Sequence, residues 1–135
     1  MQLDSSSFVA DPELLRVLLT RATPVPCLAD RVLLHQDDPP IGVYILLRGA
    51  ATLQMDTHDG HPIFTIEAQP GSVLGLPGLV SDQPYSLTAT ARAGADVRFV
   101  SRTDFFAIVQ ADPTLSLKML QLLAAEVRTA RKALL

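Results

Sequence analysis

Three successive patterns of hydrophobic positions run along the chain. From about residue 11 to 20 the apolar residues recur at helical spacing, from 23 to 101 they form short runs between turn residues, and from 102 onward helical spacing returns. Recurrence at three and four residues indicates amphipathic helices, whereas short apolar runs bounded by turn signals indicate strands. The pattern therefore predicts one helix, a many-stranded β unit and a helical C-terminal part.

The start signals of the first helix are clear. Asp11 can cap the helix, and Pro12 suits its first turn because that position needs no backbone N–H. We expect a short amphipathic helix over residues 11–20. Its apolar face consists of Leu14, Leu15, Leu18 and Leu19.

Short apolar segments separated by Gly, Pro and Asp residues make up the predicted β unit. Pro24 and Pro26 exclude a helix and favour an extended edge segment. Asp59–Gly60 is the clearest hairpin signal, and we expect a type I′ turn there. The even spacing predicts a small sandwich or barrel. The expected strands are residues 31–35, 42–47, 50–55, 62–67, 73–74, 85–90 and 96–100.

Two helices are predicted after the β unit. Ser101 or Thr103 can cap a short helix that ends near Gln110, and Asp112–Pro113 starts a long helix through the remaining residues. The long helix has two apolar stripes, which lie roughly 90° apart at 100° per residue. The first stripe, suited to packing on the β unit, is Leu115, Met119 and Leu122. The second stripe, with coiled-coil spacing, is Leu120, Leu123, Val127, Ala130 and Leu134.

The composition predicts one folded domain over residues 1–135. An apolar fraction of 48% with 19% charged residues is typical of a well-filled globule, and no apolar run reaches the roughly 20 residues that span a bilayer. The first residues lack the basic and apolar regions of a secretory signal, so we expect a cytoplasmic protein without a membrane partner. The net charge of −3 opposes direct binding to nucleic acid. Cys27, the only cysteine, excludes an internal disulfide.

A glycine-rich segment over residues 71–80 interrupts the β pattern. Its residues allow only a short helical turn around Leu76–Val80 before the alternation resumes near Tyr85. A strand, a short turn and a second strand can expose a row of backbone N–H groups, which is one way that proteins hold an anion. We call residues 71–87 the cassette.

This cassette resembles the phosphate-binding cassette of the cyclic nucleotide-binding domain family, in particular the regulatory module of the catabolite activator protein superfamily. The segments 42–49 and 69–75 also resemble that family, and the resemblance covers about residues 12–135. It implies an α+β fold that is mainly β: an antiparallel β-roll or jelly roll (double-stranded β-helix) over 23–101, with an N-terminal helix, a short cassette helix and helices over 102–135. The family's transcription factors continue into a DNA-binding domain. We expect no such domain within residues 1–135, which form either a stand-alone module or part of a larger chain.

The resemblance also implies a ligand site. In that family a cassette Glu accepts a hydrogen bond from the ribose 2′-hydroxyl, and an Arg neutralises the cyclic phosphate. Leu76 and Tyr85 stand at those two positions, and Pro77 removes a backbone donor, whereas Ser86 and Gly75 match the family. We therefore expect weak or no cyclic nucleotide binding and no other cofactor. The implied site residues are Gly75, Leu76, Pro77, Gly78, Tyr85, Ser86 and Leu87.

No motif predicts catalysis or a metal site. The sequence has no Gly-x-Ser-x-Gly elbow, no His-Glu-x-x-His and no P-loop lysine. His35, His58 and His61 have no cysteine pair to help them hold a metal, so we interpret the last two as solvated turn residues.

Two functions stay open: a non-catalytic regulatory or sensor domain with a small ligand in the β-roll, or a structural or interaction module without one. In either case the second stripe predicts a homodimer through the C-terminal helix.

Overall fold

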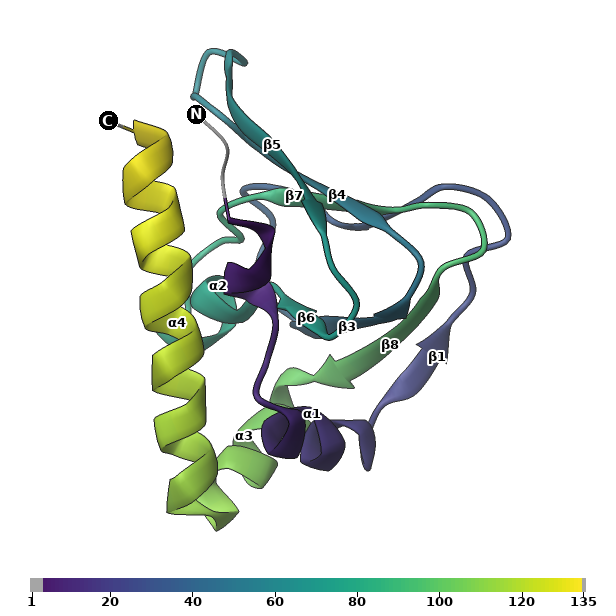
Figure 1. The fold of residues 1–135 in the computed structure, drawn as a ribbon, viewed down its shortest axis with the longest axis vertical. Helices are drawn as coiled ribbons and strands as arrows, with labels where there is room; N and C mark the ends of the chain where they lie inside the picture. Colours follow the sequence, from purple (N-terminus) through teal and green to yellow (C-terminus); the bar gives the residue numbers. More distant parts are fainter. Residues whose placement is uncertain (1–3, 135) are drawn as a thin grey trace.

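The computed structural model describes residues 4–134, with Leu134 described for its backbone alone. Two four-stranded antiparallel sheets form a roll, and the helices gather on one side of it (Figure 1). The sheet orders are β1-β8-β3-β6 and β2-β7-β4-β5. The strands are β1 (Thr23–Val25), β2 (Arg31–Leu34), β3 (Gly42–Arg48), β4 (Ala51–Asp56), β5 (Pro62–Ala68), β6 (Ser72–Leu74), β7 (Thr88–Ala91) and β8 (Asp96–Ser101). The helices are η1 (Ser5–Phe8), α1 (Pro12–Leu19), α2 (Leu76–Ser81), α3 (Arg102–Ala111) and α4 (Pro113–Leu134). This is the predicted mainly β fold, with the predicted short cassette helix and long C-terminal helix.

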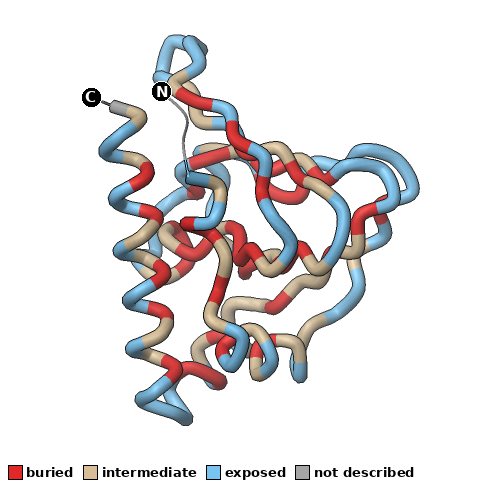
Figure 2. The backbone as a smooth tube through the Cα atoms, in the orientation of Figure 1, coloured by how far each residue is buried: buried red, intermediate tan, exposed pale blue. Residues whose placement is uncertain are grey.

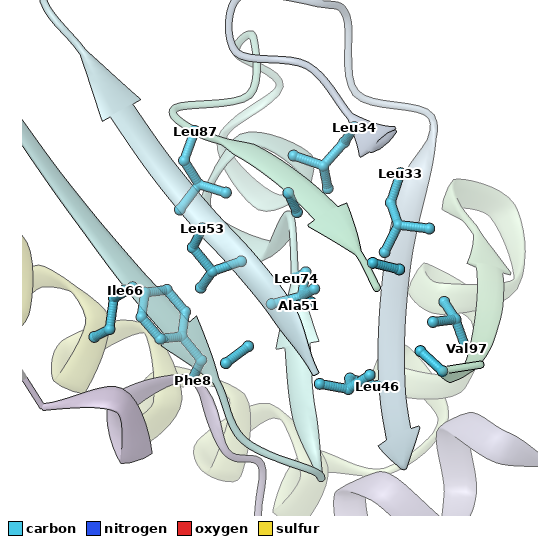
Figure 3. Close-up of a cluster of buried hydrophobic side chains, with 14 of the residues drawn as sticks. Phe8, Leu33, Leu34, Leu46, Ala51, Leu53, Ile66, Leu74, Leu87 and Val97 are labelled. Carbon is cyan, nitrogen blue, oxygen red and sulfur yellow. The ribbon is translucent and has the colours of Figure 1, made fainter. Parts of the chain in front are cut away.

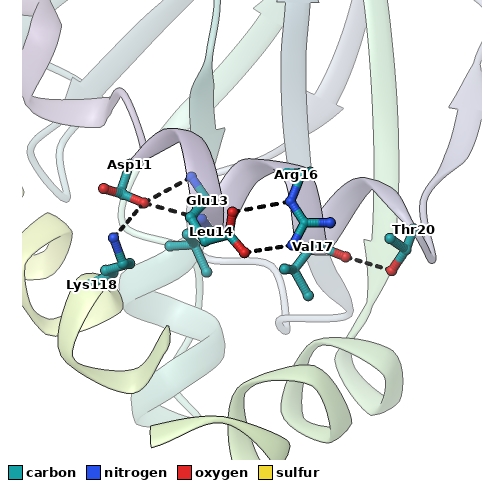
Figure 4. A network of polar contacts seen from close by, with 7 residues as sticks. All are labelled: Asp11, Glu13, Leu14, Arg16, Val17, Thr20 and Lys118. Atoms are coloured by element: carbon teal, nitrogen blue, oxygen red, sulfur yellow. Dashed lines mark hydrogen bonds and ion pairs between the residues drawn. The ribbon is translucent and has the colours of Figure 1, made fainter. Parts of the chain in front are cut away.

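The helix start signals act as the sequence predicts. The Asp11 side chain accepts hydrogen bonds from the backbone N–H groups of Glu13 and Leu14 at the start of α1. It also pairs with Lys118 Nζ of α4 at 2.9 Å, so the same carboxylate joins the first and last helices (Figure 4). Ser101 caps α3 by accepting from the N–H of Asp104.

Two buried clusters hold the roll and helices together. One cluster fills the interior between the sheets and includes Leu46, Leu53 and Leu74 (Figure 3). The other, the helix-side cluster, lies between the β3 sheet and the helices, where Val43 and Ile45 pack among buried leucines of α1 and α4. Both faces of β3 are therefore buried, which explains its almost unbroken apolar run.

The long helix α4 runs along one side of the roll and has one buried face (Figures 1 and 2). Leu115, Met119 and Leu122, the first stripe, are buried against α1, α3 and the β3 sheet. Farther along, α4 contacts η1 and β5. In the described part of the chain, no helix has both the length and the apolar character needed to cross a membrane.

Two local predictions were wrong. Strand β7 begins at Thr88 rather than at residue 85, because Tyr85 turns inward to bond the backbone of Gly42. The hairpin at Asp59–Gly60 has a positive φ at Gly60 alone, with the Gly60 N–H bonded to the Thr57 carbonyl. This is a turn followed by one left-handed glycine rather than a type I′ turn, which needs positive φ at both central residues.

Candidate ligand pocket

A cavity of about 170 Å³ opens between the β-roll and α4. Its walls are mostly apolar and come from segments far apart in the sequence. Leu34, Leu74 and Leu87 are among the interior side chains that line it, and Figure 3 shows how they enter from different segments. The lining residues are Phe8, Leu34, Met55, Phe64, Leu74, Gly75, Pro77, Gly78, Tyr85, Ser86, Leu87, Glu126, Val127, Thr129 and Ala130.

Most of the predicted site residues meet at this cavity. Gly75, Pro77 and Gly78 come from α2 and the residue before it, while Tyr85, Ser86 and Leu87 come from the loop before β7. Leu76 is different: it is 1% exposed and packs in the helix-side cluster rather than lining the cavity. Leu76 therefore presents no side chain to this cavity.

The glycine before α2 is required by its surroundings. Gly75 has φ of +94°, and a Cβ built there would lie 2.9 Å from Cε1 of Tyr85. L-residues with side chains rarely adopt this backbone conformation, and that separation is shorter than carbon atoms tolerate. Gly75 thus lets the aromatic ring pack directly against the cassette backbone.

Tyr85 holds the cassette to the backbone at the start of β3. Its side chain is 3% exposed, and its hydroxyl donates to the Gly42 carbonyl at 2.8 Å. The same oxygen accepts from the backbone N–H groups of Ile41 and Gly42 at 3.0 and 3.3 Å. A phenol held in three backbone contacts carries no charge with which to neutralise a phosphate.

Glu126 is the unexpected member of the lining. It is 6% exposed, and its Oε2 atom has no hydrogen-bond partner among the described residues. Burial raises the pKa of Glu126 from its ordinary 4.5 to about 8, because the apolar surroundings disfavour the charged carboxylate. At neutral pH the free protein therefore holds a mostly protonated carboxylic acid at the cavity wall.

Sequence reasoning missed Glu126, although a signal for it exists. Continuing the first stripe from Leu122 by four and then three residues reaches Glu126 and Thr129, which are 6% and 4% exposed. The expected stripe stopped where the apolar residues stopped. A polar residue in register with a buried helical face was the available clue.

The charges around the cavity do not suit an anion. Among the described lining residues none is Lys, Arg or His, and Glu126 is the only one with a carboxyl group. Histidines do not gather elsewhere: His61 pairs with Asp59 in an exposed turn, and residues 4–134 contain no cluster of three metal-ligating side chains. The cavity thus combines apolar walls with one buried acid.

Comparison with known proteins places this architecture in a family. The sequence profile of the cyclic nucleotide-binding domain matches residues 24–112, more than half of the chain. The chain therefore belongs to the cyclic nucleotide-binding domain family, which confirms the resemblance.

Solved structures agree on the fold. The Thermus thermophilus catabolite activator protein has a TM-score of 0.75 at 22% identity, over 92% of this chain and 58% of that one. A transcriptional regulator from Thermotoga maritima has a TM-score of 0.71 at 22% identity, over 89% of this chain and 94% of that one. The sensor domain of the transcriptional regulator DNR from Pseudomonas aeruginosa has a TM-score of 0.66 at 19% identity, with coverages of 90% and 82%.

The curated relatives are far longer than this chain. Patatin-like phospholipase domain-containing protein 6 of Homo sapiens is 26% identical over 122 residues, which is 88% of this chain and 8% of that protein. The Pongo abelii protein of the same name matches equally, over 9% of its length. The chain spans less than a tenth of either relative.

Removing the Tyr85 hydroxyl tests whether its hydrogen bonds to the backbone of Gly42 stabilise the fold. We expect Tyr85→Phe to lower the free energy of unfolding by about 1–3 kcal/mol, because buried backbone groups of Gly42 lose their partner. Chemical denaturation measures this change. Tyr44→Phe is the matched control, because no hydrogen bond of its hydroxyl is found within residues 4–134, and it should change stability less. Equal effects of the two substitutions would contradict the role.

The buried acid should make stability depend on pH. The folded state keeps the Glu126 proton at pH values where the unfolded chain has lost it, so raising the pH favours unfolding. Between pH 5 and pH 8 we expect the wild type to lose roughly 2–4 kcal/mol relative to Glu126→Gln. Urea denaturation at several pH values measures the difference. Glu67→Gln, which removes an exposed carboxylate from β5, should leave the wild-type slope, and parallel curves for wild type and Glu126→Gln would refute the prediction.

Proposed function

We propose that this domain is a non-catalytic sensor whose β-roll cavity takes a small ligand other than a cyclic nucleotide. The observation that carries the proposal is the cavity lining, in which the described residues provide one buried carboxyl group and no cation. The fold is that of the cyclic nucleotide-binding domain family, while the groups at the cavity lack the charge that a cyclic phosphate needs.

A cyclic phosphate would meet three unfavourable conditions here. Tyr85 supplies no positive charge, and Pro77 supplies no backbone donor. Glu126 would either hold its proton or, once ionised, repel the phosphate. A desolvated anion without a cation is strongly disfavoured, so weak or absent affinity follows.

Catalysis is not supported by the same groups. An acid–base mechanism needs titrating groups within reach of a reacting atom, usually with a nucleophile or a second acid–base group beside them. Glu126 and Tyr85 are the lining side chains of this kind, and the phenol of Tyr85 is engaged with the backbone. Ligand-dependent regulation is therefore the function we infer.

A second candidate function is dimerisation through α4, with or without a ligand. Leu120 and Val127 of the second stripe are 56% and 54% exposed, whereas Leu123 is partly buried. Val127 and Ala130 also line the cavity, so one stretch of helix would serve both the pocket and the partner. The side chain of Leu134 lies outside the described residues.

The cassette makes a direct prediction for nucleotides. Isothermal titration with cyclic AMP and with cyclic GMP should give no binding heat at micromolar concentrations, because no lining cation among the described residues compensates the phosphate. Thermal denaturation with each nucleotide should likewise show no shift. A micromolar dissociation constant for either nucleotide would overturn the proposed function.

The dimer has a separate test. We expect sedimentation equilibrium to give a dimer for the wild type and a monomer for Leu120→Glu with Val127→Glu. The double substitution would bury two unpaired carboxylates from each chain in the interface formed by the second stripe. Gln121→Glu is the control, since this exposed position lies on a helix face that points away from the second stripe. A wild-type monomer at tens of micromolar, or a dimer that survives the double substitution, would exclude this interface.

A further inference from the structure

The unsatisfied carboxyl group of Glu126 limits which ligands the cavity can favour. It is more than nine-tenths buried, and its Oε2 lacks a hydrogen-bond partner within the described residues. A buried polar atom without a partner is rare in folded proteins and usually has a specific cause. Oε2 itself has almost no accessible surface, but its side chain lines a cavity, so a rotation of the carboxyl group would let a ligand provide the missing partner.

We propose that the cavity binds a small amphiphile with an apolar body and a basic nitrogen, an alkyl- or arylalkyl-ammonium, whose nitrogen pairs with Glu126. This inference rests on the proposed function and names its ligand class. The ligand binds between the β-roll and α4, with its nitrogen at the helix and its apolar part against the roll.

The walls suit the apolar part of such a ligand. Phe8, Phe64 and Leu74 come from η1, β5 and β6 and are buried parts of the roll interior. An apolar cavity of about 150 Å³ is large enough for benzene, so about 170 Å³ admits a ring with part of a short side chain. Because the cavity is also open to solvent, the ligand can extend beyond that volume.

The charge preference follows from the lining, in which the described residues supply one carboxyl group and no cation. A phosphate or carboxylate ligand would face an acid and, within the described lining, no cation. A neutral apolar ligand would leave the acid without an ionic partner. An ammonium ligand forms a charge-assisted hydrogen bond, and on binding the carboxylic acid releases its proton to solvent to become the carboxylate.

Other titrating groups lie away from this pairing. Tyr85 lines the cavity, but its hydroxyl is bonded to the backbone of Ile41 and Gly42. On the segments that contact α4 near the cavity, Asp4 at the η1 cap and Glu67 of β5 are exposed. The proton released at neutral pH is therefore assigned to Glu126.

Three probes with one apolar body test the proposal: phenethylamine, its neutral analogue propylbenzene and the anion 3-phenylpropionate. With the intact chain at pH 7, phenethylamine should bind at least about tenfold more tightly than propylbenzene, and 3-phenylpropionate most weakly. Calorimetry in phosphate and in Tris buffer should show proton release with the amine alone.

The variants identify the group responsible. Glu126→Gln should weaken phenethylamine about tenfold to hundredfold, remove the buffer dependence and leave propylbenzene unchanged. Glu67→Gln, with an exposed carboxylate removed, should behave as the wild type. Equal affinities for the three probes, no binding of any probe, or an amine preference that persists in Glu126→Gln would overturn the ligand class.

A cyclic AMP titration in the same series separates the two proposals. If neither the amine nor cyclic AMP binds, the ammonium inference is wrong while the rejection of cyclic nucleotides stands. If cyclic AMP binds at micromolar concentration, the proposed function fails, whatever the amine does.

Discussion

The burial of one carboxyl group in the inward face of α4 is the constraint on which the rest of this structure depends. The first stripe continues into Glu126, so the helix cannot cover the roll without taking that side chain out of water. Holding the acid protonated avoids a buried charge, but it leaves a polar group whose Oε2 has no partner in the described part of the chain. The proposed ligand, by pairing with this carboxyl group, would stabilise the arrangement in which α4 lies on the roll.

The two halves of α4 are therefore held differently. Near its start, Leu115 and Met119 pack in the helix-side cluster and Lys118 pairs with Asp11, which ties the helix to α1 (Figure 4). Farther along, the inward face meets the cavity through Glu126 and Thr129. Ligand occupancy would act mainly on this second half, where Val127 and Ala130 join the pocket to the second stripe. These two residues would connect the proposed ligand to the proposed dimer interface.

The cassette is held by packing and backbone hydrogen bonds rather than by charged contacts. Gly75 keeps a left-handed conformation, but the space it leaves is filled by the ring of Tyr85. Tyr85 joins the cassette to Gly42, and Leu76 packs into the helix-side cluster. Leu76 and Tyr85 thus have structural roles, and the carboxyl group at the cavity comes from α4.

Much of this fold was predictable from local chemistry, and the site was predictable only in part. The helix caps and the edge-strand proline depend on neighbouring residues, so the sequence pattern identifies them; they are Asp11, Ser101 and Pro24. The direction of Leu76 depends on how α2 packs against distant segments, which no spacing rule supplies. Glu126 lies about forty residues beyond the cassette, and no local motif connects them.

The most direct measurement is an NMR titration of the Glu126 side-chain carboxyl, with ¹³C-labelled glutamate and Glu126→Gln to assign the signal. In the free protein we expect the pKa of Glu126 to lie far above the ordinary 4.5, at about 8. Saturating phenethylamine should lower it, because the paired ammonium favours the carboxylate. A pKa near 4.5 in the free protein, or one that the amine leaves unchanged, would contradict the account.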